Sequence, residues 1–534
     1  RWGRYWLDLA RYADTAGDNA DYPIPEAHLY RDYVIDAFND DMPYNQFVRE
    51  QLAGDILAQN GPRERYADQV AATGFLALSR RYATGPYELW HLTLEDSIDT
   101  IGQVFMGLSL RCARCHDHKF DPVTQQEYYG LYAILESTQY PWAGAEEFQS
   151  QNRPREHFVP LLPPEEVATL RTEFNQSLAT QDSLDEQQKQ QLVAAQKQGF
   201  PHTIPSAYAV REGNIRATVF QFAGDPGRPG QVIDRSLPEF LPQVPSPAVN
   251  TGRSGRLELA QWLTEPKHPL TARVIVNRIW QHHFGRGIVA TPSNFGMRGA
   301  APSHPELLDW LTQSFIENGW SMKALHRQIL TSQTWQLSSA HHPDNLSIDP
   351  ANQFLWRHSR RRLDAEAIRD SMLQASGLLK TERPGSHPFP PITDWHYTQH
   401  NQFRDFYPSS HRSVYLMTSR LQRHPFLALF DGPDPNTTTA ERTSSTVPPQ
   451  ALYLMNSNEV REYASAFANR VLAASPDERI SLAYQLAFQR DPDTAEIERA
   501  AQFLREYTTH LDEQGAWTAF CRTMLISHEA FHVD

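Results

Sequence analysis

One short window of the sequence, residues 111–122, holds most of the side chains that could attach a cofactor. It contains Cys112 and Cys115, three residues apart, and His116 follows the second cysteine directly. Cys-x-x-Cys-His is the attachment pattern of c-type haem. Two thiols one helical turn apart can form thioethers to the two haem vinyl groups, and the adjacent imidazole then lies under the ring to ligate the iron. The spacing therefore predicts covalent haem c, with His116 as the proximal ligand.

The same window allows two other interpretations. Cys112, Cys115 and either His116 or His118 are also suitable ligands for zinc or another divalent metal. Alternatively, the cysteines form a local disulfide or remain as plain thiols. His118 lies only two residues beyond His116, so it fits better as a supporting group or as a ligand to something else than as the sixth iron ligand. For that sixth position the candidates are Met106, a distant histidine or no protein ligand.

A second group of polar and aromatic side chains is concentrated in residues 387–424. The candidates for binding a substrate are His396, His400, Arg404, His411 and Arg412. His396 and His400 have the i, i+4 spacing of a metal pair on one helix face, although helix propensity is poor there. Interleaved histidine, arginine and aromatic residues also suit binding of a sugar-like or anionic ligand. The alternative is a set of ordinary residues in long loops.

A haem site can take part in substrate chemistry only if a pocket reaches it. We therefore expect the second half of the chain to fold back on the first half. At least one of the five candidate side chains should then lie near Cys115 and His116. The alternative is two independent domains hinged by residues 163–250, with the 387–424 cluster on a remote face.

The elements that must position these residues are predicted to be mainly α-helical. Apolar residues recur at helical spacing before the cysteine window, at Ile98, Ile101 and Phe105, and again after it. Residues 163–199 are rich in Gln, Glu, Ala and Leu, which predicts a polar helical spacer. Residues 205–245 alternate apolar and polar positions with turn residues between them, which predicts a small β-hairpin element.

The resulting architecture is two helical domains joined by that spacer and hairpin. The first domain is predicted to cover residues 1–140, the connector 141–255 and the second domain 256–534. The chain begins at Arg1 with no initiator methionine, so we expect a truncated first domain and a signal peptide that is not present.

Composition excludes several classes of protein. A net charge of −14 argues against nucleic-acid binding, which needs a basic stripe to neutralise phosphates. No apolar run approaches the ~20 residues of a membrane span. Three cysteines are too few for a disulfide framework, and Cys521, on an apolar helix face, is expected to be a core thiol.

Several longer runs carry a family resemblance: RWGRYWLDLARYADTAGDN, GLSLRCARCHDHKFDPVTQQEYYGLYAIL, VNRIWQHHFGRGIVATPSNFGMRGAAPSHPELLDWL, LDAEAIRDSMLQASG and FDGPDPNTTTAERTSSTVPPQALYLMN. The chain resembles the planctomycete-type cytochrome-c-associated proteins that carry paired domains of unknown function. CARCHDHKFDP is the most specific of these signals.

The resemblance implies an exported protein, periplasmic or extracellular, that works with a cytochrome or another electron-transfer partner. Its haem motif corresponds to Cys112, Cys115 and His116, and no activity is attached to the paired domains. Because the sequence begins at Arg1, we expect the family's N-terminal cytochrome module and usual lead-in helix to be missing, which puts any inter-haem electron route in doubt.

Three functions compete at this point. The first is a haem-dependent oxidoreductase or electron-transfer protein that oxidises or processes a carbohydrate-like substrate. The second is a metal-stabilised scaffold that holds a polysaccharide or a partner protein at the cell envelope. The third is a non-redox hydrolase that uses carboxylates such as Asp8, Asp14 or Asp431. Visible absorbance separates the first function from the other two.

Overall fold

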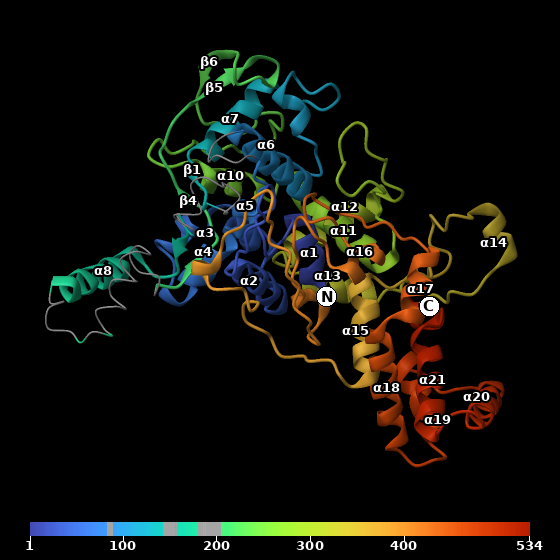
Figure 1. Cartoon of the computed structure of the whole chain (residues 1–534). Coiled ribbons are helices and arrows are strands. Elements are labelled where there is room, and N and C mark those ends of the chain that lie inside the picture. Colours follow the sequence, from blue (N-terminus) through green and yellow to red (C-terminus); the bar gives the residue numbers. More distant parts are fainter. Residues whose placement is uncertain are drawn as a thin grey trace.

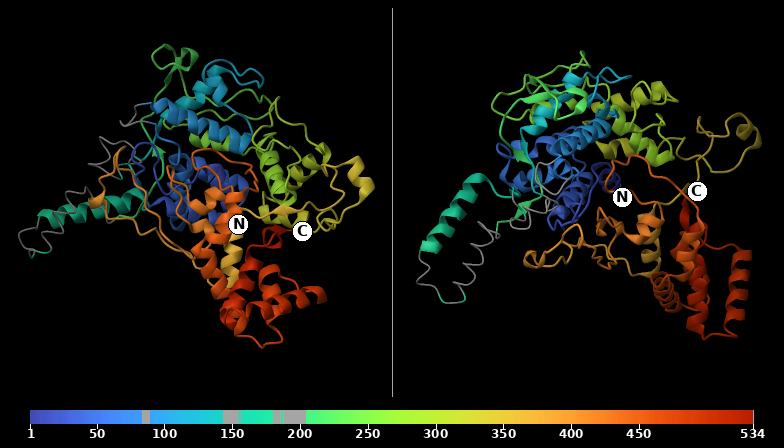
Figure 2. Two further views of the ribbon diagram at one scale, coloured as in Figure 1. Left: turned by 45° about the vertical axis from the view of Figure 1, so that its right-hand side comes forward. Right: turned by 45° about the horizontal axis from the view of Figure 1, so that its top comes forward.

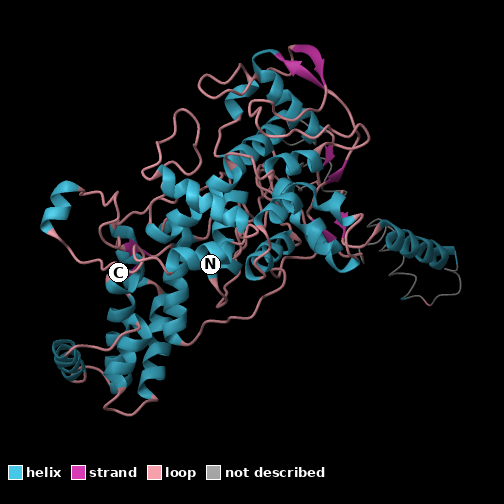
Figure 3. Cartoon of the chain, turned by 180° about the vertical axis from the view of Figure 1, so that it is seen from behind, coloured by secondary structure: helices cyan, strands magenta, loops and turns pink. Residues whose placement is uncertain are grey.

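The protein is described by a computed structural model that covers residues 1–82, 89–142, 155, 157–179, 185, 187 and 204–533. Helices dominate, and the strands of these residues occur only as short antiparallel pairs (Figure 3). The prediction of a mainly α-helical fold is confirmed. No helix in the described ranges is long and apolar enough to cross a membrane.

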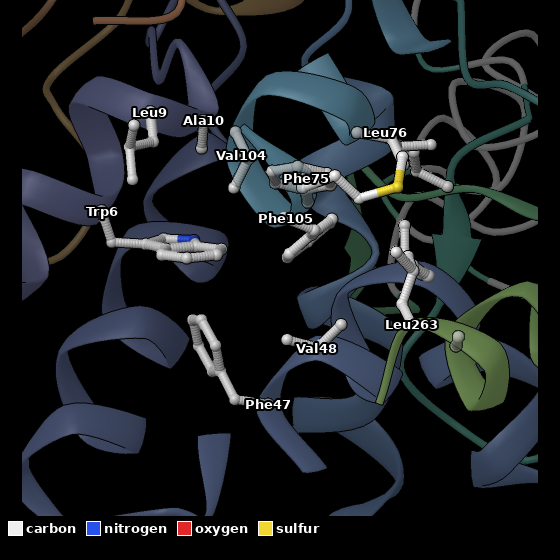
Figure 4. Packing of buried hydrophobic residues seen from close by; sticks show 14 of the residues in the cluster. Trp6, Leu9, Ala10, Phe47, Val48, Phe75, Leu76, Val104, Phe105 and Leu263 are labelled. Carbon is white, nitrogen blue, oxygen red and sulfur yellow. The ribbon is translucent and has the colours of Figure 1, made fainter. Parts of the chain in front are cut away.

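The larger hydrophobic core is built by helices from two distant stretches of sequence (Figure 1). The first stretch contributes α1 (Trp2–Ala10), α2 (Ala27–Asn39), α3 (Tyr44–Ala58), α4 (Tyr66–Ala72), α5 (Gly74–Ala77), α6 (Trp90–Ile101) and α7 (Gln125–Glu136). The second contributes α10 (Arg256–Leu263), α11 (Thr271–Phe284), α12 (Pro305–Glu317) and α13 (Met322–Leu330). Figure 4 shows Trp6 of α1, Phe47 of α3 and Leu263 of α10 meeting Phe105, from the π-helical turn Gly102–Met106 after α6, in the core.

A second core lies in the C-terminal part of the chain. It is built by α15 (Ala365–Ser376), α16 (Pro425–Leu429), α17 (Pro448–Asn456), α18 (Asn458–Leu472), α19 (Arg479–Phe488), α20 (Thr494–Tyr507) and α21 (Glu513–Leu525). Cys521 is fully buried among these helices, as predicted. Figure 2 shows this group extending away from the larger body, with the short α14 (Pro343–Ile348) on a loop before it.

The two cores divide the chain at a different place from the predicted domain boundary. Residues 256–330 belong to the predicted second domain, yet their apolar side chains are buried in the same core as residues 1–140. Leu259, Trp262 and Val276 are each almost completely buried there. Among the helices, the boundary between the cores therefore falls between α13 and α15, although Trp395, after α15, is also buried in the larger core. Helical periodicity reveals which face of a helix is apolar but not which other helix covers it.

The connector contains the predicted elements. Helix α8 (Pro164–Ala179) is polar and points away from the body (Figure 2); the rest of the predicted spacer, 180–199, lies outside the described residues apart from 185 and 187. The predicted hairpin is β5 (Thr218–Gln221) paired with β6 (Pro229–Ile233). The other pairs are β1 (Thr138–Gln139) with β4 (Arg211–Glu212), β2 (Val159–Pro160) with β3 (Ser206–Ala207), and β7 (Arg361–Arg362) with β8 (His532–Val533).

Candidate functional site

The Cys-x-x-Cys-His segment forms an exposed turn on the larger body. A 3₁₀ turn, Arg111–Arg114, carries Cys112, and Cys115 ends it. Both thiols are free and exposed, so no disulfide joins them. The His116 ring is also exposed, and its Nδ1 lies 2.6 Å from the backbone oxygen of Asp117. If Nδ1 carries the proton and donates it to that oxygen, the Nε2 lone pair is left for a metal, as in most metal-ligating histidines.

Buried neighbours hold the turn at this place. Ala113 is completely buried, and its N–H donates to the carbonyl of Leu110. Arg111 and Arg114 both form ion pairs with the buried carboxylate of Glu95 on α6. The side chains on either side of the cysteines are therefore fixed to the body, which leaves the two thiols facing outward.

The start of α7 fixes the other end of the segment. Thr124 is the N-cap, and together with Glu127 it forms a capping box. The carboxylate of Asp117 accepts a hydrogen bond of 2.8 Å from the N–H of Gln125. Asp117 thus neutralises part of the positive helix terminus and closes the loop after His116.

The β5–β6 hairpin covers one side of the cysteines. Gly224 follows β5 in a left-handed conformation, with φ of +72°. A Cβ atom at this position would lie 2.6 Å from Cys115 Sγ, which is closer than side chains tolerate. Arg114 also donates to the Gly224 carbonyl at 2.7 Å. A glycine is therefore required for the hairpin to approach this thiol.

The rest of the CARCHDHKFDP run has a structural role; the sequence predicted His118 as a supporting group or a ligand and indicated no role for Asp121. His118 Nδ1 accepts hydrogen bonds from the N–H groups of Asp121 and Phe120, at 2.8 and 3.3 Å. The neutral ring must then carry its proton on Nε2, so neither nitrogen has a free lone pair for a metal. Asp121 accepts from the N–H of Met297 at 2.8 Å and thereby joins the turn to the loop after α11.

Large apolar side chains are exposed on the segments beside the turn. The exposed fractions are 46% for Phe120, 51% for Phe222 and 77% for Met297. The guanidinium of Arg298 lies 5.1 Å from the centre of the Phe120 ring. Exposed apolar groups of this size, contributed by three segments, are typical of a surface that contacts another molecule or a flat cofactor.

The alternatives for this window differ in how well the structure accommodates them. Among the described residues, no three His, Cys, Asp or Glu side chains are grouped so as to hold a metal ion. Met106, a candidate for the sixth ligand, is completely buried in the larger core, whereas His116 is exposed. The two thiols and the His116 ring are all exposed.

The segment 387–424 lies against the first residues of the chain rather than against the cysteine turn. Gln402 donates to the Asn19 carbonyl at 3.0 Å, and the N–H of Phe403 donates to that of Ala20 at 3.1 Å. No helix joins His396 and His400, because residues 398–401 form a tight turn. The helical metal pair predicted from their spacing is therefore wrong.

The other three candidates also lie elsewhere. Arg404 donates to Gln402, and His411 lies 3.6 Å from the carboxylate of Glu382. Arg412 is exposed and lines a cleft beside α15. The second half of the chain does fold back on the first, as expected. However, the hydrogen bonds and ion pairs of these five side chains in the described residues are with groups other than residues 111–118.

The carboxylates considered for hydrolysis form hydrogen bonds that hold segments of the chain together. Asp14 accepts a hydrogen bond of 2.5 Å from the Tyr12 hydroxyl and one of 2.8 Å from the Thr418 N–H. Asp8 accepts two bonds of 2.9 Å from Arg442. Asp431 accepts from the hydroxyl and the N–H of Ser445. Each carboxylate is thus tied to a partner.

These features define a mainly helical protein with two cores and an exposed Cys-x-x-Cys-His turn. Comparison with family models gives two matches: PSCyt2, a protein of unknown function (DUF1549), over residues 1–140, and PSD1, a protein of unknown function (DUF1553), over residues 255–504. The chain therefore belongs to the planctomycete cytochrome-associated proteins in which these two domains are paired. Comparison with curated proteins and with solved structures gives no match.

Proposed function

We propose that this chain is an exported c-type haem protein with an electron-transfer role. Cys112 and Cys115 would hold the haem as thioethers, and His116 would be the proximal ligand. When bound, the haem supplies a one-electron carrier. The observation that carries the proposal is the state of the three side chains: both thiols are free and exposed, and the His116 ring is held at Nδ1 by the Asp117 carbonyl.

The surroundings of the turn support transfer to a partner rather than to a deeply buried substrate. The turn is at the surface, and Phe120, Phe222 and Met297 place exposed apolar area beside it. The residues of the chain have two tasks here. Glu95, through its two arginine ion pairs, keeps the thiols in position, and the Asp117 carbonyl keeps the imidazole in one tautomer. A cytochrome or a similar redox protein is the proposed partner.

Production in a host that exports the chain and matures c-type cytochromes tests the attachment. We expect an intact mass one haem above that of the polypeptide and a c-type band in the denatured pyridine adduct. Replacing both Cys112 and Cys115 by Ala should abolish the added mass. Cys521→Ala is the matched control, because that thiol is buried in the second core and should not affect attachment.

His116→Ala separates ligation from attachment. The thioethers do not need the imidazole, so the added mass should remain while the visible spectrum changes. A matured sample that binds zinc and carries no added mass would refute the haem proposal. It would instead favour the metal-stabilised scaffold.

A further inference from the structure

A polar cleft lies where α1, α11, β7, α15 and the loop 439–444 meet, and it has a volume of about 1180 Å³. Helices α1, α11 and α15, which contribute to its lining, lie near the centre of Figure 1. The volume exceeds the ~300–1,000 Å³ of an ordinary small-molecule site. It is therefore large enough for a ligand of several rings.

Arginine is the main charged residue of this cleft. Nine arginines and seven carboxylates line it, in a chain whose net charge is −14. The cleft is thus positive although the protein is acidic.

Most of the carboxylates already have cationic or hydroxyl partners. Glu366 accepts from both Arg4 and Arg442, and Arg442 also holds Asp8. Asp364 accepts from Arg4 at 2.6 Å. These two arginines and three carboxylates form a network that is buried except at Asp364 and has no surplus of positive charge. The excess positive charge must therefore lie elsewhere in the cleft.

Two arginines carry that excess at the α11 end. Arg278 is 2% exposed, and its guanidinium donates only to backbone carbonyls, those of Val104, Gln103 and Pro292. Arg361 donates to the His282 carbonyl at 2.6 Å. In the described residues neither guanidinium has a carboxylate at ion-pair distance, and both Nε–H groups are buried without a hydrogen-bond partner.

The pKa directions agree with this charge distribution. Burial lowers the pKa of Arg278 to about 10. Burial, with Arg1 adding to it, also lowers the pKa of Arg361. The pKa of His282 falls well below its usual value because of burial and the charges of nearby arginines, including Arg4 and Arg278. His282 therefore stays neutral, and its ring stacks on Tyr5 with centroids 3.6 Å apart.

We infer that this arginine-lined cleft binds an organic ligand through an oxyanion, a carboxylate or a sulfate group, held by Arg361 and Arg412 in the field of Arg278. Guanidinium groups bind planar and tetrahedral oxyanions through paired hydrogen bonds. An incoming anion would compensate a buried charge that now has none. Of the five residues predicted to bind a substrate, Arg412 is the one found in the lining of this cleft.

The inference does not depend on haem, because the lining residues of the cleft do not include the cysteine turn. A protein with both Cys112 and Cys115 replaced by Ala should therefore bind the anion as the unaltered protein does. Failure of haem attachment and failure of anion binding are thus separate results.

The first test uses inorganic sulfate as the probe. Sulfate replaces chloride at constant ionic strength, and the melting temperature is measured at each sulfate concentration. In a parallel experiment, arginines are modified with phenylglyoxal and the modified positions are mapped by mass spectrometry. We expect a saturable rise in melting temperature and protection of Arg361 and Arg412. Arg361→Met should weaken sulfate binding by about tenfold or more, since one charge-assisted pair is lost.

Arg228→Met is the matched control, because Arg228 is exposed on the β5–β6 turn, outside the cleft. If Arg361→Met does not fold, Arg412→Met replaces it, since Arg412 is exposed and its loss leaves no described ion pair broken. An equal effect of the control variant, or sulfate binding that does not saturate, overturns the inference.

The second test identifies the anion. Binding of glucuronate, glucose 6-sulfate and neutral glucose is measured by calorimetry. Preference for glucuronate assigns a carboxylate ligand, and preference for glucose 6-sulfate assigns a sulfate ester. Glucose that binds as well as both acids, or acids whose binding is unchanged in Arg361→Met, overturns the inference.

Discussion

The cysteine turn and the arginine-lined cleft represent two ways of building a site. The turn is one continuous window, and its reactive groups, Cys112, Cys115 and His116, are exposed. The cleft takes its residues from positions as distant as Arg4 and His532, and its central ion pairs are buried. The difference teaches that a local motif can be recognised without its fold, whereas a site made from distant ion pairs depends on the fold being formed.

The sharpest test of this comparison is Arg442→Met. Arg442 is the shared partner of two buried carboxylates, Asp8 and Glu366. Its loss leaves buried negative charge uncompensated, which should cost about 3–5 kcal/mol of unfolding free energy. Replacing both Cys112 and Cys115 by Ala should change that free energy by less than about 0.5 kcal/mol, because both side chains are exposed. Denaturant unfolding of the two variants checks both values, and similar losses would erase the distinction.

Acid should weaken the contact between α11 and α13. Burial lowers the pKa of His283 to about 3 and that of His326 to about 4, and these rings lie 3.0 Å apart, Nε2 to Nδ1. Because the unfolded chain binds these protons near pH 6.5, the contribution of the neutral rings to stability is fully present above that pH. Stability is lost as pH falls from about 6.5 toward 4 and 3, by up to roughly 1.4 kcal/mol per pH unit for each ring.

Unfolding measured against pH checks this slope. The variant carrying both His283→Phe and His326→Phe should have a shallower slope between pH 6.5 and 4, whatever its stability at neutral pH. His510→Phe is a suitable control, because that ring is exposed and far along the chain. A slope unchanged in the double variant would contradict the assignment.

Glu366 should contribute to acid sensitivity at lower pH. Burial alone would raise the pKa of Glu366, but contact with Arg4 and Arg442 outweighs burial and lowers the pKa to about 2. This stabilising contribution is present above pH 4.5 and is lost as pH falls toward 2. Glu366→Gln should remove that part of the pH dependence while Glu506→Gln, on the exposed face of α20, leaves it in place.

A smaller effect is expected from Gly224→Ala, which tests whether the hairpin is part of the turn. The added Cβ would crowd Cys115 Sγ, and the left-handed backbone adds strain of about 1–2 kcal/mol. We expect slower labelling or haem attachment at Cys115 than at Cys112, measured by peptide mass spectrometry. Gly385→Ala is the control, because no atom lies within 4 Å of a Cβ built there.

The smallest change should come from Thr124→Ala, which removes the N-cap of α7 just after the turn. A lost cap of this kind costs about 1 kcal/mol. Thr124→Ser should retain both the hydroxyl acceptor and the stability. A loss equal in the Ser and Ala variants would show that the capping hydroxyl is not responsible.

Many helices could be predicted from the sequence because their signals are local. The apolar spacing of residues 270–284 and the following Gly285 correspond to α11 and its left-handed cap, with φ of +84°. The spacing of Leu307, Leu311 and Phe315 corresponds to α12. Periodicity and caps are properties of neighbouring residues, so they can be recognised without knowledge of the rest of the chain.

The supporting parts of the turn were not predictable in the same way. His118 was predicted as a supporting group or a ligand, and Asp121 was given no role; they hold backbone N–H groups within the loop and on Met297. No sequence signal links Asp121 with a residue 176 positions later. A hydrogen bond of this kind can be identified only in the folded structure, where the positions of both segments are known.

By itself, the sequence determined the helices, the hairpin and the presence of a Cys-x-x-Cys-His motif, because each depends on residues a few positions apart. Only the tertiary structure decided that α10–α13 share a core with α1–α7 and that Arg278 and Arg361 face a cleft with no carboxylate partner among the described residues. The physical reason is that burial and charge compensation are set by which segments meet. Forty-nine Lys and Arg residues and 63 Asp and Glu residues can be paired in very many ways, and the fold selects one of them.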